Sequence, residues 1–364
     1  MRTLLFILFI LITGFNTFSQ SEEGVNKSIG FEAFRGFIYE HKPQISHLIT
    51  DHPMGFRIVY NRKSHGDEVW QQRYNFPDRG LTFIYMDYRD DRLGKTLALL
   101  PHFNLYLRGK REAKSQFQFK AGFGAGYTTE KYNKVDNNQN NVISTDLTGA
   151  VLFQFGHEYQ LSERLSLNSS LSVTHFSNGA IKKPNSGINI FAANVGLHYM
   201  FDYRKKSFNY MEEPKLASRP IGYSVILIGG GHESLKIGSG TKPFFVLTGI
   251  VDKKINHKSR FGAGLELFYS ESLKEEIKYD ENVDPDTDFK RVGLVLSHEM
   301  MVNEFSIMTQ AGYYIYDPYK AFQPVYVRLK LRRYFGDHIF GSIGVKSHAA
   351  KAEAMEFAIG YRIK

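Results

Sequence analysis

A period-two alternation of apolar and polar residues over long runs constrains this chain more than any other sequence feature. In residues 325–332, Val or Leu stands at each odd position, whereas the even positions carry Tyr326, Arg328, Lys330 and Arg332. Three cations on one strand face cannot enter a dry core, because desolvating each would cost several kcal/mol. They can face a wet lumen. Since such runs reach about 11 residues, the length of a tilted strand crossing a bilayer, they predict transmembrane strands.

The turns between these runs predict the number of strands. We expect eight strands before residue 203 and eight after residue 218, with short connections at 160–164, 301–304 and 336–338 and long polar loops at 129–144 and 271–287. The predicted fold is therefore all-β, a transmembrane antiparallel outer-membrane β-barrel of about 14–16 strands. The alternative is two tandem eight-stranded barrels. We favour one barrel, since a short linker would crowd two barrels in the same membrane.

The N-terminus predicts export. Arg2 precedes an apolar run over residues 4–12, and Thr17 and Ser19 are small residues before a cleavage site at Gln20. This pattern is typical of a secretory signal peptide. The expected domains are a signal peptide over 1–19, a first barrel half over 20–202, a polar linker over 203–218 and a second barrel half over 219–364.

Composition restricts the partners. The chain has no cysteine, so no disulfide framework stabilises the exported protein. Its net charge of +9 suits an anionic partner. Because an exported chain seldom meets nucleic acid, we expect phosphorylated lipid headgroups, in the outer membrane of a Gram-negative bacterium.

Three polar residues interrupt the lipid-facing phase near one rim. His175 and Ser177 continue the apolar phase of residues 165–173, and Asn189 continues that of residues 191–199. Residues two apart on a strand share a face, so His175 can take the proton of Ser177 as its Oγ attacks a carbonyl. The short turn at 160–164 puts this rim on the extracellular side. Polar groups there predict a lipid-ester hydrolase.

The same segment resembles the active-site region of the outer-membrane lipid A 3-O-deacylases. The residues that carry the resemblance are His175-Phe-Ser177-Asn178-Gly179 and Pro184-Asn-Ser-Gly187, together with 100–103 and 120–127 upstream, so it covers roughly residues 54–202. It implies that Ser177 is the nucleophile and His175 the base, that Asn178 stabilises the oxyanion, and that the substrate is lipid A of the outer leaflet, cleaved at the 3-position without a cofactor. The family has a glutamate where this chain has Asn189. An amide can still accept a hydrogen bond from the imidazole, but it cannot stabilise the imidazolium by charge.

Other features favour structural interpretations. A non-catalytic barrel, acting as a pore or as a lipid- or partner-binding scaffold, is the alternative function, with Arg328, Lys330 and Arg332 lining an anion path. His348 occupies the lumenal phase near Glu353 and Glu356, without a serine at the second position after it. Five further histidines are scattered without ligand spacing and predict no metal site: these are His41, His52, His65, His102 and His298.

Overall fold

The computed structural model describes residues 26–107, 109–203, 205, 207–210, 221–234, 236–349 and 351–363. The expected signal peptide and the larger part of the expected linker lie outside the described residues.

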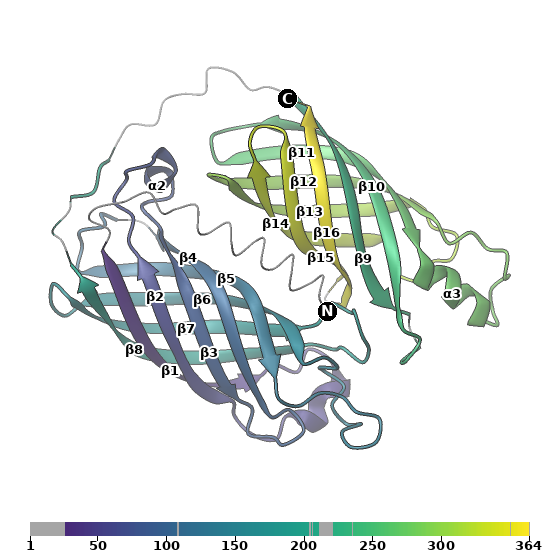
Figure 1. Cartoon of the computed structure of the whole chain (residues 1–364), viewed down its shortest axis with the longest axis horizontal. Coiled ribbons are helices and arrows are strands. Elements are labelled where there is room, and N and C mark those ends of the chain that lie inside the picture. The colour runs from purple at the N-terminus through teal and green to yellow at the C-terminus, as the bar shows by residue number, and fades with distance from the viewer. Residues whose placement is uncertain are drawn as a thin grey trace.

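The strands form two closed antiparallel barrels, each with neighbours in sequence order (Figure 1). The N-terminal barrel consists of β1 (Lys27–Ile38), β2 (Met54–Arg62), β3 (Asp78–Asp87), β4 (Lys95–Leu107), β5 (Ser115–Thr128), β6 (Leu147–Gln160), β7 (Leu165–Ser177) and β8 (Ile188–Asp202). The C-terminal barrel consists of β9 (Ile221–Glu233), β10 (Thr241–Lys254), β11 (Ser259–Ser270), β12 (Arg291–Val302), β13 (Phe305–Tyr316), β14 (Val325–Phe335), β15 (Ile339–His348) and β16 (Lys351–Ile363).

The structure confirms the all-β barrel class and corrects the preferred arrangement. The single barrel was wrong, and the tandem eight-stranded alternative is right. β8 returns to β1, with Phe191 opposite Phe37, and β16 returns to β9, with Tyr361 opposite Val225. The alternation of side chains is the same in either arrangement, so it could not reveal which strands close the sheet.

Side chains alternate between the lumen and the outer surface as the sequence pattern predicts. Along β7 the even positions are buried, while Leu171 is 68% exposed on the opposite face. Exposed aliphatic and aromatic residues recur around both barrels. This apolar outer surface is the lipid-facing surface of an outer-membrane protein.

The lumen of the C-terminal barrel holds buried ion pairs beside a cluster of buried apolar and aromatic side chains, which corrects the expectation of a wet anion path. Arg328 lies 2.5 Å from Glu266 and 2.8 Å from Glu356, and Lys330 lies 3.3 Å from Glu356. Arg332 lies 3.1 Å from Glu299. The three cations do point inward, but buried carboxylates compensate their charge in place of water.

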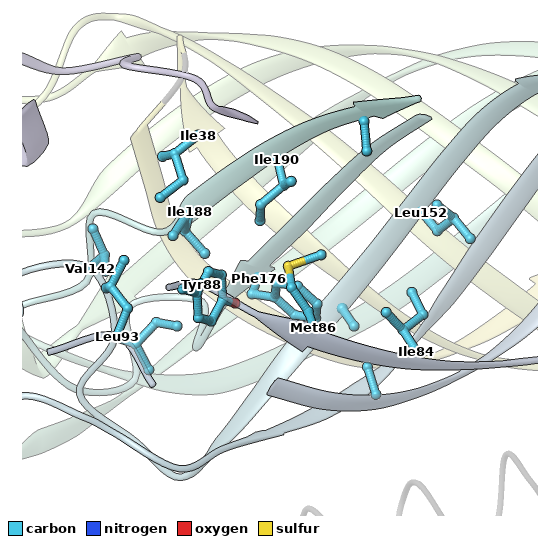
Figure 2. Packing of buried hydrophobic residues seen from close by; sticks show 14 of the residues in the cluster. Ile38, Ile84, Met86, Tyr88, Leu93, Val142, Leu152, Phe176, Ile188 and Ile190 are labelled. Carbon is cyan, nitrogen blue, oxygen red and sulfur yellow. The ribbon is translucent and has the colours of Figure 1, made fainter. Parts of the chain in front are cut away.

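The lumen of the N-terminal barrel is divided along its axis. Buried apolar residues, hereafter the apolar plug, fill the end that carries the loops 39–53, 88–94, 129–146 and 178–187 (Figure 2). They include Met86, Tyr88, Phe176 and Ile188. Beyond these apolar residues along the barrel axis, the fully buried Glu32 bonds to His198 at 3.0 Å. A polar cavity of about 670 Å³ lies toward the other end, beside Asp78, Arg111 and His198. The apolar plug separates this cavity from the rim at 178–187.

In the part of the chain that the structure describes, three short helices lie in loops between strands. They are η2 (Pro43–Leu48), α2 (Val69–Arg73) and α3 (Glu271–Tyr279). The structure confirms the short turns at 161–164, 303–304 and 336–338, whereas α3 occupies part of the expected loop 271–287. Among the described residues, none of the helices has the length and apolar character needed to cross a membrane.

The two barrels touch at both ends. At one end, Met355 N–H donates to Gly179 O at 3.0 Å, which joins β16 to the β7–β8 loop. At the other end, Tyr74 Oη donates to Met301 O at 2.6 Å. Because corresponding rims meet, the barrels run side by side with the same orientation.

Candidate active site

The core beneath the site fixes the direction of its side chains. Phe176 is fully buried and lies in the apolar plug near Tyr88, Met86 and Ile188 (Figure 2). Since successive side chains on a strand alternate, anchoring Phe176 inward turns His175 and Ser177 outward. Both are half-buried, as expected near the edge of a lipid-facing surface. The predicted outward phase is therefore present.

His175 and Asn189 are direct cross-strand partners. The register between β7 and β8 places them opposite one another, and His175 Nδ1 lies 2.7 Å from Asn189 Oδ1. An amide oxygen only accepts, so Nδ1 of His175 carries the proton. This tautomer leaves Nε2 of His175 free to accept a proton from a nucleophile.

His41 extends this chain of hydrogen bonds. Asn189 Nδ2 lies 3.2 Å from His41 Nδ1, and His41 Nε2 lies 3.1 Å from Ser186 O. With the proton on Nε2, His41 accepts from Asn189 and donates to Ser186, which orients the amide of Asn189. The sequence alone gives no sign that His41 belongs to this site. Only the closure of β8 onto β1, where Tyr39 N–H bonds to Asn189 O at 2.9 Å, brings it to the site.

Two donors converge on the Ser177 hydroxyl. Gly179 N–H lies 3.1 Å from Ser177 Oγ, and Asn185 Nδ2 lies 2.8 Å from the same oxygen. Asn178 N–H donates to Asn185 Oδ1 at 3.2 Å, which turns the Asn185 amide nitrogen toward the serine. No sequence pattern assigns a role to Asn185 or Gly179, although both lie in the segments that carry the family resemblance.

The side chain of Asn178 forms hydrogen bonds within the loops and not to Ser177. Its side chain is buried, and Nδ2 donates to Ser144 Oγ at 3.0 Å and to Lys182 O at 2.8 Å. The side-chain amide of Asn178 therefore joins Ser144 to the backbone at Lys182, and its backbone N–H holds Asn185. Its predicted role as oxyanion donor stays a prediction.

Gly187 separates the imidazole from the serine. A Cβ atom at this position would lie 2.9 Å from His175 Cε1 and 3.5 Å from Ser177 Cβ. The residue also has a φ of +71°, which favours glycine. Any side chain at 187 would enter the space between the two reacting groups.

The described atoms of His175 and Ser177 make no direct hydrogen bond with each other. Both nevertheless line the space beside Gly187, and catalytic hydrogen bonds often form fully only when substrate is bound. The arrangement supplies a base with a defined tautomer, a hydroxyl and two converging donors. These are the elements of nucleophilic attack on an ester.

No metal cluster accompanies these groups, because the described part of the chain holds no set of three His, Cys, Asp or Glu side chains suited to a metal ion. In the C-terminal barrel, His348 points into the lumen as expected and bonds to Glu353 at 2.8 Å.

Two family models match this chain. Residues 54–198 match the family described as "Lipid A 3-O-deacylase (PagL)", and residues 221–364 match "Acyloxyacyl hydrolase, C-terminal domain". No curated protein matches the chain. Among solved structures, Neisserial surface protein A is 9% identical with a TM-score of 0.34, covering 49% of this chain and 100% of its own. The outer membrane enzyme PagL is 16% identical with a TM-score of 0.31, covering 46% of this chain and 97% of its own.

Proposed function

We propose that this chain, a member of the lipid A 3-O-deacylase (PagL) family of the Gram-negative outer membrane, hydrolyses the acyl ester at the 3-position of lipid A with Ser177 and His175. The observation that carries the proposal is the outward-facing set formed by His175, bonded to Asn189 at 2.7 Å, and Ser177, whose Oγ accepts from two donors.

The tautomer of His175 supports its role as the base. Nε2 accepts the hydroxyl proton of Ser177 as Oγ forms a bond to the ester carbonyl carbon. The same proton then passes to the departing sugar oxygen, and the acyl chain stays on Ser177 as an ester. Water then attacks this acyl-serine while His175 takes its proton. His175 returns that proton to Oγ, which releases the fatty acid and restores the Ser177 hydroxyl.

The donors at Ser177 support an oxyanion site. Gly179 N–H and Asn185 Nδ2 already converge on Ser177 Oγ. When Oγ attacks the ester, the carbonyl oxygen is bonded to the same carbon that Oγ attacks, and it would therefore lie near both donors. Donors fixed before the reaction stabilise developing charge without reorganisation. We propose this pair as the oxyanion site in place of the Asn178 side chain that the family resemblance implies, with the Asn178 backbone N–H holding Asn185 in place.

With Asn189 in place of a carboxylate, the reaction should be slower. It orients His175 by a hydrogen bond, and His41 in turn orients Asn189. A neutral amide gives no ionic stabilisation to the imidazolium formed in the transition state. We therefore expect a lower kcat than in a relative with glutamate at this position.

The surroundings of the site suit a substrate held in the membrane. Below Asn189 on the same outer face, Phe191 stacks on Phe37 at 5.6 Å and packs against Tyr39 at 5.5 Å. Aromatic side chains are enriched at the membrane–water boundary. Acyl chains of lipid A can lie along this face while the ester reaches Ser177.

Mass spectrometry of lipid A tests the proposal. Purified protein is incubated with lipopolysaccharide, and the lipid A is compared for wild type, Ser177→Ala and Ser169→Ala. Ser169 is a matched control because it faces outward on the same strand. We expect wild type and Ser169→Ala to remove one 3-hydroxyacyl chain and Ser177→Ala to remove none. Equal activity in all three proteins would disprove the Ser177 assignment.

A further inference from the structure

The loop 178–187, hereafter the catalytic loop, is held from outside its own barrel. Among the described residues, four backbone groups of this loop bond to the C-terminal barrel. Lys183 N–H donates to Glu233 Oε2 at 2.5 Å, and Ala180 O accepts from Glu233 N–H at 3.2 Å. Ile181 O accepts from Thr241 Oγ1 at 2.8 Å, and Gly179 O accepts from Met355 N–H at 3.0 Å.

Glu233 is the centre of this contact. It lies at the end of β9 and is 2% exposed. Its second carboxylate oxygen, Oε1, accepts from Gly238 N–H at 2.8 Å and from Gly240 N–H at 3.1 Å. One buried carboxylate therefore ties the β9–β10 loop of its own barrel to the catalytic loop of the other. Hydrogen bonds to a charged acceptor are stronger than neutral ones, and here three N–H groups share it.

The C-terminal barrel packs closely against Gly179, the residue of the catalytic loop whose N–H donates to Ser177. Gly179 has a φ of +64°, and a Cβ atom on it would lie 2.8 Å from Met355 Cβ. Its N–H is one of the two donors to Ser177 Oγ, while its carbonyl bonds to Met355. A single glycine thus contacts the nucleophile on one side and the C-terminal barrel on the other.

We propose that Glu233 is a positioning residue for the proposed deacylation, so that the two barrels together build one active site. Glu233 touches neither Ser177 nor the ester. It acts through the backbone of the catalytic loop, which fixes the directions of Gly179 N–H and Asn185 Nδ2. This inference rests on the proposed function and adds a role for the C-terminal barrel in the oxyanion site.

The contact predicts a specific kinetic defect. Without the Glu233 carboxylate, the Lys183 end of the catalytic loop loses its anchor, and the two donors to the oxyanion lose their fixed directions. A small misplacement of catalytic groups costs about a hundredfold in rate. Because the outer face that binds the acyl chains is unchanged, KM should change little while kcat falls.

The experiment uses the full chain in detergent or liposomes with lipopolysaccharide as substrate. We expect Glu233→Ala to lower kcat about tenfold to a hundredfold with KM nearly unchanged. Glu233→Gln keeps one acceptor oxygen and should lose less. Glu281→Gln changes an exposed glutamate at the same rim and should match wild type. Hydrogen exchange should show faster exchange of the Lys183 amide in Glu233→Ala only.

The outcomes separate the inference from the proposed function. Wild-type kcat in Glu233→Ala, with Ser177→Ala inactive, would overturn the inference and leave the Ser177 site intact. Activity in Ser177→Ala would refute the proposed function itself. If Glu233→Ala does not fold, Thr241→Val removes a neighbouring hydrogen bond at an exposed position and should lower kcat a few-fold. Unchanged kcat and unchanged loop exchange in Thr241→Val would then contradict the inference.

Discussion

Replacing Asn189 with aspartate should accelerate the reaction. Aspartate has the shape of asparagine, so an oxygen stays where Oδ1 now lies, 2.7 Å from His175 Nδ1. The substitution introduces a charge beside the imidazolium that forms in the transition state, without adding bulk to the half-buried site.

The magnitude follows from two opposing effects. With charge centres about 4 Å apart, the attraction is about 1 kcal/mol in water and about 4 kcal/mol at the dielectric of a protein surface, so about 2 kcal/mol suits a half-buried pair. The carboxylate cannot donate to His41 Nδ1 as the amide does, which costs about 1 kcal/mol. The net stabilisation of about 1 kcal/mol corresponds to a rise in kcat of about fivefold.

The assay is release of 3-hydroxy fatty acid from lipopolysaccharide under saturating conditions, at a pH where His175 is neutral. Asn189→Leu, of similar size and without a polar group, is the control and should reduce kcat. A kcat that is unchanged in both variants would refute the role of Asn189 as the orienting group of His175.

Three further substitutions test other parts of the account. Asn185→Ala removes a donor to Ser177 Oγ and should lower kcat about a hundredfold with little change in KM, measured by the same assay; a loss confined to KM would argue against the oxyanion role. Gly187→Val places a branched side chain between His175 and Ser177 and should lower kcat more than about a hundredfold while the barrel still migrates as a heat-modifiable band; near-normal activity would contradict the observed packing. Glu266→Ala leaves Arg328 and Tyr326 without a shared buried partner and should reduce the free energy of unfolding by about 3–5 kcal/mol in urea titrations, with kcat of the folded protein preserved; a stability equal to wild type would show that the lumenal network is dispensable.

The local part of this structure follows from the sequence, and the long-range part does not. The alternation along 165–177 gives the outward direction of His175 and Ser177, because each strand position alternates regardless of its partners. Closure is different. Whether β8 pairs with β1 or continues to β9 depends on contacts between residues far apart in the sequence, such as Phe37 and Phe191, which are 154 positions apart.

The same limit explains which site residues were missed. His41 reaches Asn189 only through barrel closure, and Glu233 reaches Lys183 only through contact between the barrels. Asn185 and Gly179 lie in the recognised segment, but their direction toward Ser177 depends on the folded loop. The lumenal cations show a further limit. Alternation puts Arg328 inside the barrel, but its neutralisation by Glu266 depends on cross-barrel distances that a pattern does not contain.

The most direct test of the central claim is the location of a covalent adduct. A fluorophosphonate reacts with an activated serine by displacement of fluoride, and peptide mass spectrometry identifies the modified residue. We predict one adduct on Ser177, with its rate of formation strongly reduced in His175→Ala and unaffected by Ser169→Ala. An active enzyme that carries its adduct on another residue, or whose Ser177 reacts at the same rate without His175, would contradict the account.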